Sequence, residues 1–123
     1  MNTLSSLILK FFRHYLNNEK GCSKNTLESY SKCIQMLLNF CRTEKKMNID
    51  TIDLTDFSQD LILEFLDYLE KVRGNGANTR NQRLAIIKSF FRYAANQQPS
   101  FLDTSQKVCA IGTKKLRVSL LKV

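Results

Sequence analysis

Residues 78–94 constrain the fold most, because their pattern predicts one long helix with two different sides. Its apolar residues recur at the spacing of one helix face: Leu84, Ile87, Phe91 and Ala94. A glycine-containing turn precedes the stretch, and Asn78 or Thr79 is expected to cap the helix. Pro99 lies just beyond the expected end. One side of this helix is therefore expected to enter a core.

Three more helices are predicted ahead of it. The first is expected over residues 5–17, where apolar side chains form one stripe. The second follows an N-cap at Ser23 and reaches about residue 43. The third follows an N-cap at Ser58, and Gly74 and Gly76 are expected to end it. These spacings predict an all-α fold, a four-helix bundle.

Two segments have weak or no helical period. Residues 44–57 are expected to be a connection pinned to the core by a few apolar side chains. Residues 101–123 mix basic and apolar residues, which is typical of a flexible basic C-terminal tail. We therefore expect a helical domain over residues 1–100 and a linker over residues 101–123.

The charge of the chain indicates its class of partner. Nineteen Lys and Arg face eleven Asp and Glu, which gives a formal net charge of +8. Such an excess predicts a polyanionic partner, most often nucleic acid. An apolar content of 43% is ordinary for a globular core. No apolar run approaches the ~20 residues needed to cross a bilayer, and no signal peptide is recognisable, so no membrane partner is expected.

The cysteines give no sign of a metal site. Four of them lack C-x-x-C spacing, and only one histidine accompanies them. Those within helical patterns are expected to act as small apolar residues in a reducing cytoplasm. We expect neither a metal nor another cofactor.

The second side of the fourth helix has the chemistry of a DNA-binding surface. The residues at 85 and 89 are small, so their side chains project little from that side of the helix. Residues with amide and cationic side chains surround them. Such a surface suits the major groove of duplex DNA. The candidate contacts on this helix are Thr79, Arg80, Asn81, Arg83, Lys88 and Arg92. Because cations near a helix N-terminus oppose its dipole, a compensating anion is also expected there.

The start of the second helix is a further candidate. Its free backbone N–H groups favour a phosphate oxygen, and basic and polar residues occupy the first turns. The candidate contacts are Lys24, Asn25, Thr26 and Lys32. Thr26 has a second interpretation, in which it only supports the cap.

Three stretches of the chain resemble one known family. Residues 23–30 and 61–69 are similar to the starts of its second and third helices. Residues 79–94 closely resemble its pattern T-x-x-x-R-L-A-x-I-[KR]-x-F-F-R-Y-A. The chain is thus similar to the N-terminal core-binding, SAM-like domain of tyrosine recombinases of the phage-integrase class. Residues 108–115 resemble the segment that leads into the catalytic domain of transposon-associated integrases, although Gly112 stands where proline is common.

The resemblance implies a function. The domain is expected to form half of a clamp around double-stranded DNA, with its second and fourth helices at the major groove. Lys114 and Lys115 are expected to follow the DNA backbone. Catalysis belongs to a separate C-terminal domain, in which a tyrosine attacks a phosphodiester. This chain is therefore expected to have no catalytic residue of its own, and the full-length protein is expected to act as a tetramer on DNA.

Two alternatives come from other classes of protein. A helical adaptor could bind another protein through the apolar residues of 108–123, without nucleic acid. An independent small enzyme is disfavoured, because the chain lacks paired carboxylates, a nucleophile beside a base and a phosphate-binding glycine loop.

Overall fold

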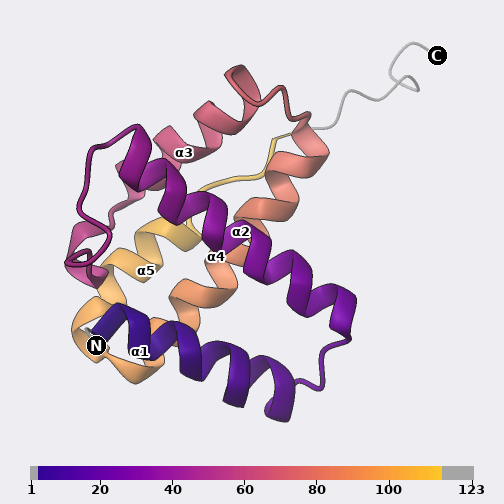
Figure 1. The fold of residues 1–123 in the computed structure, drawn as a ribbon, viewed down its shortest axis with the longest axis vertical. Coiled ribbons are helices and arrows are strands. Elements are labelled where there is room, and N and C mark those ends of the chain that lie inside the picture. The colour runs from indigo at the N-terminus through magenta and orange to yellow at the C-terminus, as the bar shows by residue number, and fades with distance from the viewer. Residues whose placement is uncertain (1–2, 115–123) are drawn as a thin grey trace.

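The fold is entirely helical over residues 3–114, the part that the computed structural model describes (Figure 1). This confirms the predicted all-α class. The α-helices are α1 (Thr3–Lys10), α2 (Lys24–Thr43), α3 (Gln59–Lys71), α4 (Ala77–Gln97) and α5 (Leu102–Cys109). A π-helical segment, η1 (Phe11–Glu19), continues α1, and two short 3-10 turns are η2 (Leu54–Asp56) and η3 (Pro99–Phe101). Helix α4 packs against α2, α3 and α5.

Two of the predicted helix starts are confirmed by their caps. The Ser23 hydroxyl accepts a hydrogen bond from the backbone N–H of Thr26, and the Ser58 hydroxyl accepts one from Leu61. Both serines have extended backbone angles, as N-caps require. The predicted end of α2 near residue 43 is confirmed as well. The first helix is longer than predicted, because η1 extends it to Glu19.

The start of α4 differs from the prediction. Gly76 is the N-cap, so Asn78 and Thr79 lie inside the first turn and do not cap the helix. Gly76 therefore begins α4, whereas Gly74 completes the turn after α3 with a φ of +70°. A left-handed φ is readily adopted only by glycine, which explains Gly74 at this position.

Residues 101–111 pack against the other helices of the domain. This corrects the expectation that a linker begins at residue 101. Helix α5 lies against α4 and α3. Phe101, Val108 and Ile111 are buried in the common core, together with the hydroxyl residue Ser105. These positions share one helix side, but a serine interrupts the apolar pattern. Val108 and Ile111 are thus not free to bind another protein, as the adaptor alternative required.

The core contains a cluster of aromatic rings around Phe11. This ring is fully buried and lies 5.2 Å from Phe90 and 5.3 Å from Tyr93, measured between ring centroids. Tyr15 and Tyr30 pack on the same ring at 5.6 and 6.0 Å. The cluster joins η1, α2 and α4, so it fixes how the start of the chain sits against the fourth helix.

The connection between α2 and α3 is held by both apolar and polar contacts. Ile52, Leu54 and Phe57 are buried as predicted, whereas Ile49 is exposed. The Asp53 carboxylate accepts hydrogen bonds from the backbone N–H of Leu54 and of Leu4, at 2.8 and 3.0 Å. Asp53 therefore caps the start of α1 from a distant part of the chain.

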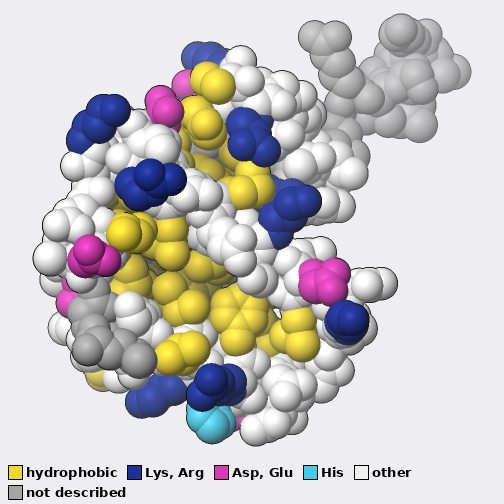
Figure 2. Space-filling view, in the orientation of Figure 1, with side chains coloured by type: hydrophobic (Ala, Val, Ile, Leu, Met, Phe, Trp, Pro, Cys, Tyr) yellow, Lys and Arg dark blue, Asp and Glu magenta, His cyan; other side chains and the backbone are white. Residues whose placement is uncertain are grey.

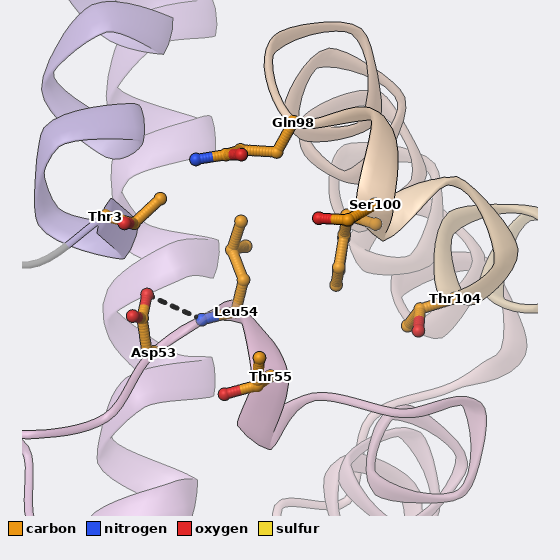
Figure 3. Close-up of a pocket in the computed structure, with 8 residues that line it drawn as sticks. Thr3, Asp53, Leu54, Thr55, Gln98, Ser100 and Thr104 are labelled. Carbon is orange, nitrogen blue, oxygen red and sulfur yellow. Dashed lines mark hydrogen bonds between the residues drawn. The ribbon is translucent and has the colours of Figure 1, made fainter.

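A cavity of about 330 Å³ adjoins Asp53, between the start of α1, η2 and the η3–α5 turn. Figure 3 shows Thr3, Thr55, Ser100, Thr104 and Gln98 around it. Its polar lining is mostly hydroxyl groups, with no cation. No helix among residues 3–114 is long and apolar enough to cross a membrane.

Candidate nucleic-acid interface

The N-terminal ends of α2 and α4 lie on the same side of the molecule, at the right in Figure 1. A groove of about 400 Å³ runs between them. We call it the α2–α4 groove. It is lined by Asn25, Glu28, Ser29, Lys32, Gln82 and Arg83. Three of the twelve predicted contacts, Asn25, Lys32 and Arg83, thus meet at one surface although α2 and α4 are far apart in sequence.

At the start of α2, the residues that cap the helix are different from the cations that remain exposed to solvent. The Ser23 hydroxyl donates to the Thr26 hydroxyl oxygen at 3.0 Å and accepts from the Thr26 N–H at 3.2 Å. Thr26 is half-buried in this arrangement and supports the cap. Lys24 and Asn25 are exposed, and so is Lys32 two turns further along. The first turns of α2 therefore offer two cations and one amide to solvent.

Arg83 forms the opposite wall of the α2–α4 groove. Its side chain is half-buried, and its buried Nε has no hydrogen-bond partner among the residues described. This Nε is enclosed by the protein, so a ligand in the groove would meet Arg83 through the exposed part of its side chain. Gln82 is exposed beside it and adds an amide to the same wall.

Arg80 does not lie where the sequence analysis expected it. Its side chain is only 6% exposed. Its Nη1 donates to the carbonyl oxygen of Gly112 at 2.9 Å, and its Nε lies 3.8 Å from a carboxylate oxygen of Glu70. Glu70 is thus the compensating anion predicted for this helix start. The Arg80 Nε has no hydrogen-bond partner among the described residues, but the guanidinium is enclosed by the protein, so it is not accessible to DNA in this structure.

Asn81 and Lys114 are also engaged with each other. The Asn81 side-chain amide donates to the carbonyl of Lys114 at 2.8 Å and accepts from its N–H at 2.9 Å. The Lys114 ammonium lies 2.9 Å from Glu70. The predicted contact Lys115 lies outside the described residues. Asn81 therefore binds backbone of this chain, in place of the base edge that the sequence suggested.

Lys88 and Arg92 lie toward α5. The Arg92 guanidinium donates to the Cys109 sulfur at 3.8 Å, and that thiol donates to the carbonyl of Lys88 at 3.9 Å. Arg92 remains exposed and Lys88 is half-buried. Thr79 is half-buried in the first turn of α4. Lys88 and Arg92 are thus cations on the part of α4 that contacts α5, and they do not line the α2–α4 groove.

The sequence pattern places Asn81, Ala85, Lys88 and Arg92 on one exposed face of α4, and of these Ala85 and Arg92 are exposed, whereas Asn81 and Lys88 are half-buried. The residues that face solvent at successive turns are Asn78, Gln82, Ala85, Arg92 and Asn96. Sequence reasoning missed Gln82, although it stands four residues after Asn78 and three before Ala85. It also missed Ser29 and Glu28 of α2. The spacing of small and amide residues at 78, 82 and 85 was the signal that could have found Gln82.

The groove is lined by two cations and one carboxylate. Figure 2 shows Lys and Arg side chains spread around the rim of a face whose centre is apolar. Glu28 is the carboxylate in the groove, one turn from Lys32 on α2 and across the groove from Arg83 on α4. A groove with cations, amides and a helix N-terminus can bind a polyanion such as a phosphodiester backbone.

Two observations on the described residues bear on metal binding and on tyrosine chemistry. No group of three His, Cys, Asp or Glu among residues 3–114 could hold a metal ion. Burial and the nearby Glu19 raise the pKa of Tyr93, which disfavours the phenolate that a nucleophile needs.

Comparisons with known proteins identify relatives for most of the chain. Residues 9–98 match the family model "Phage integrase, N-terminal SAM-like domain". The protein named integrase/recombinase y4rD of Sinorhizobium fredii is 34% identical over 95% of this chain and 42% of its own length. The tyrosine recombinase XerD of Oceanobacillus iheyensis is 32% identical over 76% of this chain and 30% of its own length. The chain thus spans less than half of these relatives. No solved structure matches it.

Proposed function

Because the chain belongs to the phage integrase N-terminal SAM-like domain family, we propose that it is the DNA-binding domain of a site-specific tyrosine recombinase. In this proposal the N-terminal halves of α2 and α4 straddle the major groove of duplex DNA and form half of a clamp. The chain supplies affinity for recombination-site DNA, and the cleavage and rejoining of strands belong to a separate catalytic domain.

The observation that carries the proposal is the α2–α4 groove. Lys32 and Arg83 reach it from two helices, with Asn25 and Gln82 beside them. Cations neutralise backbone phosphates, and amides can pair with base edges or phosphates. The half-buried Arg83 lines the groove, and a guanidinium binds phosphate well because its N–H groups can pair with two oxygens.

In this proposal, the DNA contacts are selected by the solvent exposure of the candidate side chains. Lys24, Asn25, Lys32, Gln82 and Arg83 contact DNA, and Lys88 and Arg92, further along α4, contribute positive charge. Arg80 is left out because its side chain is only 6% exposed, and Asn81 because its amide is paired with the backbone of Lys114. Thr26 supports the start of α2, and Thr79 is half-buried in the first turn of α4.

The wider context is inferred from the family. The partners of this chain are double-stranded DNA and the catalytic domain of the same polypeptide. The full-length recombinase works as a tetramer on two duplexes, in the cytoplasm.

A DNA titration at several salt concentrations tests this proposal. The chain alone should bind random duplex weakly, with modest sequence preference. If about four to six phosphates are contacted, log K should fall against log salt with a slope of about −4 to −5. Amide chemical shifts recorded during the titration should change mainly in the first halves of α2 and α4.

Matched variants separate the groove from general charge. Lys32→Ala and Arg83→Ala should weaken binding, by roughly 1–3 kcal/mol where the side chain reads a base. Arg42→Ala is the control, because Arg42 is an exposed cation ten residues along the same helix, about 15 Å from Lys32. Equal losses for all three would mean that only net charge matters. A flat salt dependence would argue instead for a protein-docking module.

A further inference from the structure

The chain leaves the domain along a defined path beside the start of α4. After α5, Ile111 is buried in the core. Residues 112–114, which we call the exit segment, are all exposed. Figure 1 shows this part of the chain running toward the N-terminal end of α4. No apolar side chain anchors the exit segment, so polar contacts must fix its direction.

Two side chains of α4 bind the exit segment through its backbone. Arg80 donates to the carbonyl of Gly112 at 2.9 Å. Asn81 uses both its carbonyl and its amide nitrogen on the backbone of Lys114, at 2.9 and 2.8 Å. The paired bonds of Asn81 resemble the exchange between two strands, and they depend on the orientation of the bound peptide. The backbone of the exit segment is therefore held at both of its ends.

A carboxylate of α3 completes the arrangement. Glu70 lies 2.9 Å from the Lys114 ammonium and 3.8 Å from the Arg80 Nε, and its side chain is 23% exposed. Arg80 is almost fully enclosed, so it needs this counter-charge to be tolerated there. Glu70 thus orients the guanidinium that binds Gly112, and it also binds the side chain of Lys114 directly. We call Glu70, Arg80, Asn81 and Lys114 the exit cluster.

We propose that the exit cluster fixes the direction in which the polypeptide leaves the domain, so that Arg80 and Asn81 are positioning residues and not DNA contacts. This inference rests on the proposed function, in which a catalytic domain follows and must reach the same DNA. The exit cluster starts the linker at the N-terminal end of α4, beside the α2–α4 groove. Glu70, Arg80 and Asn81 thereby couple the DNA-binding surface to the origin of the linker.

Backbone relaxation of the exit segment tests the inference without any activity. In the parent chain, order parameters at Thr113 and Lys114 should be about 0.85, as in rigid backbone. Asn81→Ala removes both backbone bonds and should lower them to below about 0.6, with α4 unchanged. Glu70→Gln, which keeps the shape and removes the charge, should lower them less. Glu64→Gln is the control, because Glu64 pairs with Lys45 on another surface.

Each outcome decides the matter. Low order parameters in the parent, or unchanged values in both Asn81→Ala and Glu70→Gln, would overturn the inference. So would an Asn81→Ala variant that loses DNA affinity as strongly as Arg83→Ala while the exit segment stays rigid, since Asn81 would then be a DNA contact. If the parent binds no DNA, the proposed function fails, and the order parameters still decide whether the exit cluster holds the chain.

Discussion

The sulfur of Cys33 lies 3.6 Å from the carbonyl oxygen of Arg83, so a thiol of α2 donates a hydrogen bond to the backbone of α4. Cys33 is fully buried, and its contact lies beneath the α2–α4 groove. The two helices proposed to bind DNA are therefore in direct contact behind the groove, which sets the spacing between its walls.

Burial should make Cys33 and Cys41 unreactive in the folded chain. Burial raises the pKa of the Cys33 thiol to about 12, and Arg83 offsets part of the rise. Burial, assisted by Asp56, raises the pKa of Cys41 to about 11. Because the thiolate is the nucleophile, a disulfide reagent at pH 8 should label the half-buried Cys22 and Cys109 first. All four should react in denaturant, and rapid labelling of all four in the native state would contradict this.

The same two thiols should make the fold lose stability at alkaline pH. An unfolded thiol ionises with a pKa near 8.5, whereas the folded ones keep their protons to about 11 and 12. Above about pH 9 the unfolded state binds fewer protons, so the free energy of unfolding falls as pH rises, by up to about 1.4 kcal/mol per pH unit for each thiol. Urea unfolding between pH 8 and 10 measures this slope.

The control for this slope is another cysteine. The double variant Cys33→Ala/Cys41→Ala should show a weaker dependence of the free energy of unfolding on pH. This holds whatever the two substitutions cost in overall stability. Cys22→Ala should leave the slope as in the parent. A slope that survives the double substitution would assign the alkaline sensitivity to other groups, such as Tyr93.

The sequence predicted most of the fold because most of its signals are local. Ser23 and Ser58 cap helices through N–H groups three residues away, so their neighbours are enough to identify them. Helix α5 was missed because Ser105 interrupts the apolar spacing of Phe101 and Val108. A hydroxyl group is buried there only because α5 packs on α4, which no local pattern reveals.

The candidate site was predictable in its helices but less so in its residues. The groove between the starts of α2 and α4 brings together Asn25, Lys32 and Arg83, as expected for a shared surface. The intramolecular partners of Arg80 and Asn81, which are Glu70 and the exit segment, could not be predicted, because they depend on the turn between α3 and α4 and on the path after α5. Tertiary contacts therefore decide which side chains of α4 remain exposed to a ligand.

A substitution at Val108 tests whether α5 unfolds cooperatively with the rest of the domain. Its side chain is fully buried, so Val108→Ala should lower the free energy of unfolding by about 2 kcal/mol, from lost apolar burial and the cavity left behind. Leu102→Ala, on the same helix but 51% exposed, should change it by less than about 0.5 kcal/mol. Denaturant unfolding compares them. Equal, small effects would mean that α5 is not part of the cooperative fold.

Asp53 should stabilise two helical segments at once. It accepts from Leu54 at 2.8 Å and from Leu4 at 3.0 Å. Asp53→Ala should therefore cost about 1–2 kcal/mol and speed amide hydrogen exchange at Leu4. Asp53→Asn keeps an acceptor oxygen and should retain most of the stability. The exposed Asp50, replaced by alanine, is the control, and a similar loss there would point to net charge as the cause.

Ala85 tests the low, exposed side of α4 directly. It is exposed between Gln82 and Arg92, so a glutamate fits without disturbing the core, and Ala85→Glu should change stability by no more than about 0.5 kcal/mol. On DNA, the longer anionic side chain would meet the phosphates and block close approach, so affinity should fall at least about tenfold. Leu63→Glu adds the same charge at an exposed position of α3 and should lower the affinity for DNA much less. Equal affinities for the two variants would remove this side of α4 from the DNA interface.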